Sequence, residues 1–136
     1  MKDLVIVGGG QSAAQCVLTL RRNDFKDPIT IIAEEHYLPY RRPPLSKEYL
    51  AGEVSLERVY MKTQDFFDQN NVVIKHSKAL SLDRESKSIN LSNGDTIKYI
   101  NLVIATGSRV RELDVEGSHL KNINYLRTID DSNDLK

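Results

Sequence analysis

The sequence predicts an α/β fold in which a parallel sheet is accompanied by a small antiparallel meander of three strands. Two short apolar runs, LVIV at residues 4–7 and ITIIA at 29–33, are typical of parallel strands covered on both faces. The meander is predicted by three short alternating segments, of which the last two are separated by Asn93-Gly94, a strong hairpin signal. We therefore expect a parallel sheet with a small antiparallel meander laid over it.

The first two strands are joined by a helix that we place at residues 12–22. Ala13, Val17 and Leu20 fall on one helical face, and two arginines follow where a helix C-terminus favours positive charge. Asp27-Pro28 then breaks the chain before the second strand. The whole is a strand–helix–strand unit of about thirty residues, the size of a right-handed βαβ crossover.

The rest of the chain alternates between loops and short elements. We expect an irregular loop at 36–45, and the polar residues after Ser108 to form a loop. A short helix is expected near Ser46–Ala51, with Ser46 as its cap and Gly52 at its end. The remaining predicted elements are a helix at 64–70, strands at 72–75 and 102–105, and meander strands at 79–82, 88–91 and 96–99.

Composition limits the possible functions. The 136 residues suffice for one domain, and 19 basic against 19 acidic residues give a net charge of zero, which excludes a broad basic surface for nucleic acid. The apolar run at the N-terminus is too short for a signal peptide or a membrane span. The single cysteine excludes an internal disulfide and a thiolate metal cage, and we expect no metal site and a cytoplasmic location.

The turn after the first strand carries the chemistry of a dinucleotide site. In VIVGGGQSAA, Gly8, Gly10 and Ala13 stand in the G-x-G-x-x-A pattern. This pattern is typical of the turn after the first strand of a Rossmann-like sheet. Gly8 permits a tight turn, Gly10 lets a pyrophosphate approach the backbone, and Ala13 lets the helix pack close to the sheet. The alternative is a turn that serves packing alone. Glu34 ends the second strand, where a carboxylate can hold a ribose, although it lies beyond the usual ~20 residues.

Three further segments are more specific than the glycine turn. Together with it, PYRRPPLSKEYLAG, LVIATGSRVREL and NYLRTIDD resemble the FAD-dependent ferredoxin and rubredoxin reductases, relatives of apoptosis-inducing factor in the pyridine nucleotide-disulfide oxidoreductase superfamily. The resemblance runs over essentially the whole chain. It implies a flavoprotein oxidoreductase that passes electrons from NAD(P)H through FAD to a small iron–sulfur protein, a ferredoxin or a rubredoxin.

The resemblance assigns cofactor contacts to individual residues. It implies that the glycine turn binds the FAD pyrophosphate, that the acid after the second strand holds the adenosine ribose, and that the first meander strand meets the adenine through its backbone. It further implies that the arginine before the proline pair lies along the phosphates, and that the ATG and YLRT segments lie near the cofactor. The matching residues are Gly8, Gly10, Ser12, Ala13, Glu34, Ala79 or Leu80, Arg42, Ala105, Thr106, Gly107 and Arg127, and Pro43, next to Arg42, is also expected at the cofactor.

Lys47 matches the family's lysine beside the flavin ring and is the one residue expected to act in catalysis. A fixed ammonium there stabilises the negative charge that a flavin gains when it accepts a hydride. Pro43 and Pro44 restrict the backbone, so this elbow costs little entropy to hold against a flat ring. The alternative is a solvated lysine at the start of a surface helix.

Other reactive side chains carry ordinary structural interpretations. We expect Cys16 to be a buried structural thiol and the three histidines, which show no ligand spacing, to lie in loops or on the surface. Of the pair Glu34-Glu35, we expect one carboxylate on a ribose and the other in solvent.

The resemblance also predicts how the chain is organised. Residues 1–136 match only the first part of the family's FAD-binding domain, so we expect an incomplete domain without the NAD(P)-binding and C-terminal domains. Such a chain is expected to bind FAD weakly, to be inactive by itself and to self-associate through an unpaired strand edge. Two other functions stay open: a disulfide or peroxide reductase, which needs a cysteine near the flavin, and a signalling protein with a bound flavin.

Overall fold

The computed structural model describes residues 3–136, which form two compact units. The first, here called the sheet unit, comprises the chain up to Tyr40 together with Met61–Gly107. The second, here called the elbow unit, comprises Arg41–Tyr60 and Ser108–Lys136. The residues predicted to bind FAD are divided between the two units.

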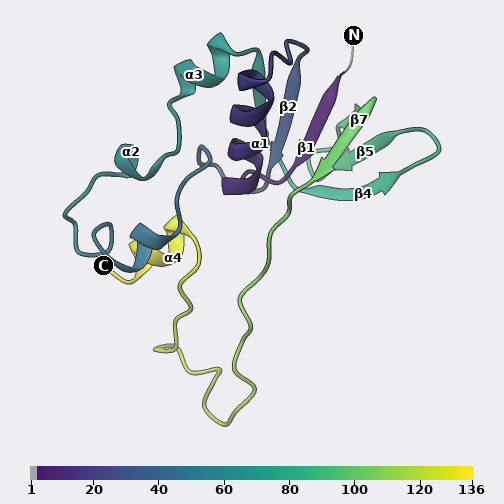
Figure 1. The fold of residues 1–136 in the computed structure, drawn as a ribbon. Coiled ribbons are helices and arrows are strands. Elements are labelled where there is room, and N and C mark those ends of the chain that lie inside the picture. Colours follow the sequence, from purple (N-terminus) through teal and green to yellow (C-terminus); the bar gives the residue numbers. More distant parts are fainter. Residues whose placement is uncertain (1–2) are drawn as a thin grey trace. The chain divides into compact units, whose positions relative to one another are not determined.

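The sheet unit is built on four parallel strands (Figure 1). Their order is β3-β2-β1-β7, and Ile6 of β1 pairs with Ile31 of β2 on one side and Val103 of β7 on the other. Side chains alternate between the two faces of the sheet. The strands are β1 (Leu4–Val7), β2 (Ile29–Ala33), β3 (Val72–His76) and β7 (Asn101–Ile104).

One face of this sheet is covered by helices α1 (Gln11–Arg22) and α3 (Gln64–Gln69). Val17 of α1 and Phe67 of α3 are fully buried in the same core as Ile6. The N-terminus of α3 is fixed by Thr63, whose hydroxyl accepts a hydrogen bond from the Phe66 N–H. Burial of these apolar faces, rather than intrinsic helix propensity, holds such short helices on the sheet.

The opposite face of the sheet packs against the antiparallel meander β4 (Ala79–Asp83), β5 (Ser88–Leu91) and β6 (Thr96–Lys98). Val5 and Ile32 point to this side, where they meet Ile89 and Leu91 of β5. Gly94 adopts a φ of +89° in the turn between β5 and β6, as its place in an Asn-Gly hairpin requires. The predicted fold class, a Rossmann-like sheet with a three-stranded meander, is confirmed.

The predicted element boundaries in the sheet unit hold to within one residue. Helix α1 begins at Gln11 rather than at Ser12, because Gly10 takes the extended N-cap conformation. Strands β3 and β4 each extend one residue further than predicted, β6 ends one residue earlier, and β7 begins and ends one residue earlier.

The elbow unit differs more from the sequence prediction. The expected helix at Ser46–Ala51, capped by Ser46, is wrong: a 3₁₀ helix, η1, spans Pro43–Ser46, and residues 47–52 form turns. Two prolines fit the first turn of a helix, because the N–H groups they lack have no helical partner there. Two short helices were not predicted: α2 (Leu56–Val59) and α4 (Ile129–Asp134), the latter in a segment expected to be a loop.

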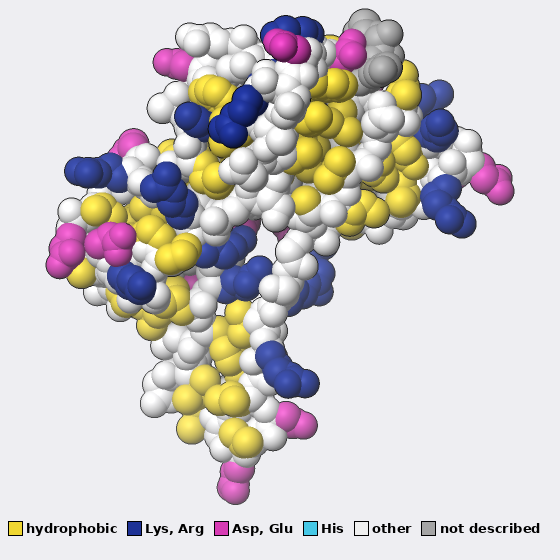
Figure 2. All heavy atoms as spheres, in the orientation of Figure 1, with side chains coloured by type: hydrophobic (Ala, Val, Ile, Leu, Met, Phe, Trp, Pro, Cys, Tyr) yellow, Lys and Arg dark blue, Asp and Glu magenta, His cyan; other side chains and the backbone are white. Residues whose placement is uncertain are grey.

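The charged side chains on the surface are mixed in sign, as expected for a chain of zero net charge (Figure 2). Basic and acidic side chains are interspersed on the face shown in Figure 2. Within residues 3–136, no helix combines the length and the apolar character needed to cross a membrane.

Candidate cofactor-binding site

The glycine turn is pressed against the end of β7. Gly8 has a φ of +118°, and a Cβ on it would stand 2.1 Å from the carbonyl oxygen of Ala105. The Gly8 N–H donates to the Ile32 carbonyl oxygen at 2.8 Å, and the Ala105 N–H donates to the Val7 carbonyl oxygen at 2.7 Å. The fold therefore brings together two segments that the sequence assigned to the cofactor, the glycine turn and the ATG segment.

The next two glycines have different surroundings. A Cβ on Gly9 would lie 2.5 Å from the Cβ of Ala33, so this glycine is needed for packing against β2. This packing role was not predicted, although the run of three glycines was a signal for it. A Cβ on Gly10 would have no atom within 4 Å, and the extended backbone of this residue suits any side chain. The space above Gly10 is therefore open.

This open space lies at the N-terminus of a helix of 12 residues. Gly10 has no side chain to cap the first turn, and no acidic residue lies in that turn. The N–H groups there and the positive end of the helix dipole suit a pyrophosphate. Ala13 is fully buried against the sheet and Ser12 is exposed. The residues present thus fit the diphosphate group of FAD.

The two acidic residues after β2 are in different environments. Glu34 is exposed, and its Oε1 lies 2.9 Å from the Nζ of Lys78. Glu35 accepts a hydrogen bond from the hydroxyl of Tyr40, and its carbonyl oxygen lies 2.9 Å from Nδ1 of His76. The expectation that one of the two carboxylates lies in solvent is therefore wrong for Glu35, whereas Glu34 is accessible to a ribose. Lys78, which the sequence analysis missed, lies two residues after the end of β3.

The segment predicted to meet the adenine begins β4 with an irregularity. Ala79 pairs with Leu91 and Ser81 pairs with Asn90, so Leu80 is an extra residue in this strand. A bulged residue is left out of the ladder, which frees its backbone for another partner. The side chain of Leu80 is 62% exposed. This geometry favours Leu80 over Ala79 as the backbone contact.

In the elbow unit, the fold brings Arg42 and Arg127 together. The Nη1 of Arg42, the N-cap residue of η1, donates to the carbonyl oxygen of Arg127 at 2.6 Å. The N–H groups of Arg127 and Thr128 donate to Oδ2 of Asp131 at 2.9 and 2.7 Å, which closes the capping box of α4. Two predicted cofactor residues thus share one hydrogen-bonded cluster.

Lys47 ends η1 at the exposed end of the proline elbow. Its N–H donates to the Pro44 carbonyl oxygen at 3.0 Å, and its side chain is exposed. Helix α4 supports the elbow through a buried contact: the fully buried Ser132 donates from Oγ to the Leu45 carbonyl oxygen at 2.8 Å. Ser132, which lies 87 positions from Leu45 along the chain, therefore holds the backbone of the elbow that carries Lys47.

Asp131 makes the stability of this cluster depend on pH. Partial burial alone would raise the pKa of Asp131, but hydrogen bonds from Thr128 and Arg127 and the charge of Arg42 outweigh it and hold the pKa below its usual 3.8. A carboxyl with a lowered pKa stabilises the folded state above its unfolded pKa and loses that contribution as the pH falls through its folded pKa. We expect the unfolding free energy, measured in urea between about pH 7 and 2.5, to fall less steeply with acid in Asp131→Asn.

Asp134→Asn, at the other end of α4, removes a carboxylate that takes no part in the capping box and is the matched control. An unchanged profile in Asp131→Asn would contradict the stabilising role of this carboxylate.

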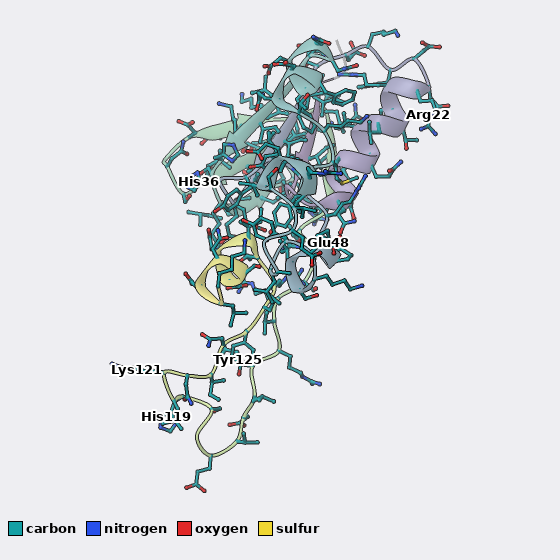
Figure 3. The ribbon with its side chains drawn as sticks, turned by 90° about the vertical axis from the view of Figure 1, so that its left-hand side faces the viewer. Arg22, His36, Glu48, His119, Lys121 and Tyr125 are labelled. Atoms are coloured by element: carbon teal, nitrogen blue, oxygen red, sulfur yellow. The ribbon has the colours of Figure 1, made fainter. Side chains whose placement is uncertain are left out.

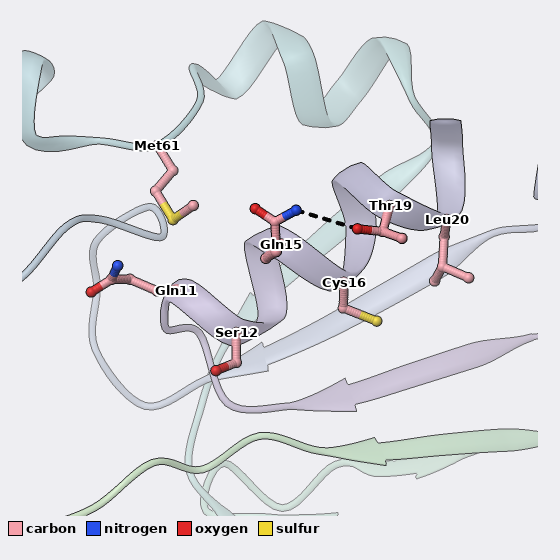
Figure 4. Close-up of a pocket in the computed structure, with 7 residues that line it drawn as sticks. All are labelled: Gln11, Ser12, Gln15, Cys16, Thr19, Leu20 and Met61. Carbon is pink, nitrogen blue, oxygen red and sulfur yellow. Dashed lines mark hydrogen bonds between the residues drawn. The ribbon is translucent and has the colours of Figure 1, made fainter. Parts of the chain in front are cut away.

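An open surface pocket runs along the outer side of α1 (Figure 4). Its lining includes Ser12, Cys16 and Met61, and the Gln15 amide donates to the Thr19 hydroxyl at 3.3 Å along α1. Burial raises the pKa of the Cys16 thiol, so it stays protonated and is a poor nucleophile. The thiol is only half-buried, which corrects the expectation of a buried cysteine.

The three histidines are exposed, as the sequence predicts. The ring centroids of His36 and His76 lie 5.6 Å apart. His119 lies in the segment between β7 and α4 (Figure 3). In the part of the chain that the structure describes, no group of three or more histidine, cysteine, aspartate or glutamate side chains is arranged to hold a metal ion.

Known proteins resemble this chain over nearly its whole length. A family described as pyridine nucleotide-disulphide oxidoreductase matches residues 2–136. The chain is 38% identical over 134 residues to a probable ferredoxin reductase, CtmF, of Castellaniella defragrans, covering 98% of this chain and 33% of that protein. It is 34% identical over 134 residues to a rubredoxin-NAD(+) reductase of Pseudomonas putida, covering 98% of this chain and 35% of that protein.

A solved structure shows the same fold. The ferredoxin reductase for the CYP199A2 system from Rhodopseudomonas palustris superposes with a TM-score of 0.92 at 36% identity, over 99% of this chain and 33% of that one. The resemblance to ferredoxin and rubredoxin reductases is therefore confirmed. The chain spans about a third of the length of the curated relatives it matches.

Proposed function

We propose that this chain, which belongs to the pyridine nucleotide-disulphide oxidoreductase family, binds FAD. It forms part of an oxidoreductase that takes electrons from NAD(P)H. The observation that carries the proposal is the open space above Gly10 at the N-terminus of α1, where a diphosphate fits. When bound, FAD supplies the capacity to accept a hydride and to release electrons one at a time. We further propose that residues 1–136 form the N-terminal segment of the FAD-binding domain.

The residues of this chain have distinct roles in the proposal. The N–H groups that follow Gly10 hold the diphosphate, and the carboxylate of Glu34 holds the adenosine ribose. Arg42 adds positive charge along the phosphates, with its guanidinium oriented by the Arg127 carbonyl oxygen. Lys47 lies beside the flavin ring and stabilises negative charge on it.

We propose a small iron–sulfur protein, of the ferredoxin or rubredoxin type, as the electron acceptor. The names of the relatives from C. defragrans and P. putida support this choice. A disulfide reductase is disfavoured, because the chain's one cysteine, Cys16, lies on α1 with a raised pKa. A cytoplasmic location and either NADH or NADPH as the donor are part of the same proposal.

Stopped-flow mixing of the complete, FAD-loaded protein with NAD(P)H, then with ferredoxin or rubredoxin, tests this function. We expect the flavin absorbance to bleach with the donor and to return much faster with the iron–sulfur protein than with dioxygen. A return no faster than with dioxygen would count against the proposed acceptor, and an absorbance that never bleaches would count against the NAD(P)H donor.

Self-association is a separate part of the proposal. Strand β7 lies at one edge of the described sheet, and its Ile104 side chain is 65% exposed. An exposed apolar edge strand can pair with a second copy of the chain. Sedimentation velocity across a range of concentrations measures this, and a single monomeric species at all concentrations would contradict it.

A further inference from the structure

Lys78 faces Glu34 at the end of two neighbouring parallel strands. Its Nζ lies 2.9 Å from Oε1 of Glu34, and the two side chains are 45% and 64% exposed. Glu34 directly follows β2, and Lys78 lies between β3 and β4. The salt bridge engages one carboxylate oxygen, and a carboxylate has a second oxygen with which to accept a hydrogen bond.

The backbone beneath this pair is fixed on both sides. The Ser77 N–H donates to the Ala33 carbonyl oxygen at 2.8 Å, which ties together the residues that precede Lys78 and Glu34. The Lys78 N–H donates to Oγ of Ser92 at 3.1 Å, and the Ser92 N–H donates to the Lys78 carbonyl oxygen at 2.9 Å. Lys78 is therefore anchored where the parallel sheet meets the meander.

We propose that Lys78 is a positioning residue for the adenosine ribose of FAD, acting by holding the carboxylate of Glu34 in the orientation that accepts the ribose hydroxyls. This inference rests on the proposed binding of FAD. A glutamate at a strand end has several rotamers in solution, and the cost of fixing one of them is a cost to binding. Lys78 restricts those rotamers before the cofactor arrives.

The next residues of the chain strengthen the assignment. Ala79 and Leu80 follow Lys78 directly, and the bulge leaves Leu80 out of the strand pairing. Lys78 thus lies between the carboxylate proposed for the ribose and the backbone proposed for the adenine. The expected effect of Lys78 on the affinity for FAD is modest, because the salt bridge with Glu34 is exposed and screened by salt.

The experiment measures the dissociation constant for FAD, by titration of flavin fluorescence, in a set of variants of the complete protein at low and high salt. Lys78→Met removes the ammonium and keeps the apolar stem, Lys78→Arg keeps the charge, and Lys98→Met changes an exposed lysine of β6 as a control. Glu34→Gln and the double variant with Lys78→Met complete a double-mutant cycle, which isolates the coupling between the two side chains.

We expect Lys78→Met to weaken FAD binding roughly two- to fivefold at low salt, with a smaller loss at high salt. Lys78→Arg should restore most of the affinity, Lys98→Met should bind as the unsubstituted protein does, and Lys78→Met should change little in the Glu34→Gln background. Unchanged or tighter binding by Lys78→Met, or an equal loss in both backgrounds, would overturn the inference while leaving the proposed function intact. Failure of the unsubstituted protein to bind FAD would instead overturn both.

Discussion

Gly8→Ala is expected to destabilise the sheet unit by about 3 to 5 kcal/mol. A methyl group there would stand 2.1 Å from the Ala105 carbonyl oxygen, which is backbone and cannot rotate away. The φ of +118° is also one that residues with a Cβ rarely adopt. Since small domains are stable by only about 5 to 15 kcal/mol, this change removes a large part of the total. Urea unfolding followed by circular dichroism measures the loss.

Gly10→Ala is the matched control, two residues further along the same turn. No atom lies within 4 Å of an added Cβ, and the backbone at φ −87° and ψ −168° is open to any residue. We expect a loss of stability under about 1 kcal/mol, because the one penalty is that alanine is a less favourable N-cap residue than glycine. Equal stabilities for Gly8→Ala and Gly10→Ala would contradict the account of the turn.

Lys47→Ala is expected to lower the midpoint potential of bound FAD by roughly 30 mV, which corresponds to about 1.4 kcal/mol for a two-electron couple. The ammonium proposed beside the ring favours the state in which the ring carries more negative charge, so its removal makes reduction less favourable. A spectroelectrochemical titration of the FAD-loaded protein measures the shift.

Two further variants make this result specific to the position and charge of Lys47. Lys47→Arg should retain most of the potential, and Lys121→Ala, an exposed lysine in the segment between β7 and α4, should leave it unchanged. The thermal unfolding of Lys47→Ala should match that of the unsubstituted protein, because the Lys47 side chain is exposed. An unchanged potential in Lys47→Ala would remove this residue from the flavin site.

The parallel sheet could be predicted because its signals are local. Both faces of the sheet are covered, so each of its strands is a short run rich in apolar residues. Such a run can be recognised in the sequence without knowing which strands pair with it. The glycine turn is equally local, since the conformations of Gly8 and Gly10 follow from their places between a strand and a helix. The role of Gly9 depends on Ala33, a partner that the sequence does not identify.

Helix α4 could not be predicted in the same way. Its sequence, IDDSND, has one large apolar residue, Ile129, and its stability comes from the Thr128–Asp131 capping box and from contacts with η1. The capping box was visible as Thr128 followed three residues later by an acid, but without an apolar pattern it was a weak signal. The hydrogen bond from Ser132 to Leu45 and the salt bridge between Lys78 and Glu34 join distant segments, which only the fold brings together.

The central claim, that the open space above Gly10 receives the diphosphate of FAD, is tested most directly by equilibrium titration of the complete protein and of its Gly10→Ala variant with FAD. The account predicts saturable binding of one FAD per chain, weakened roughly tenfold or more in Gly10→Ala because the methyl group fills the space the diphosphate needs. No saturable binding, or the same dissociation constant in a folded Gly10→Ala, would contradict it.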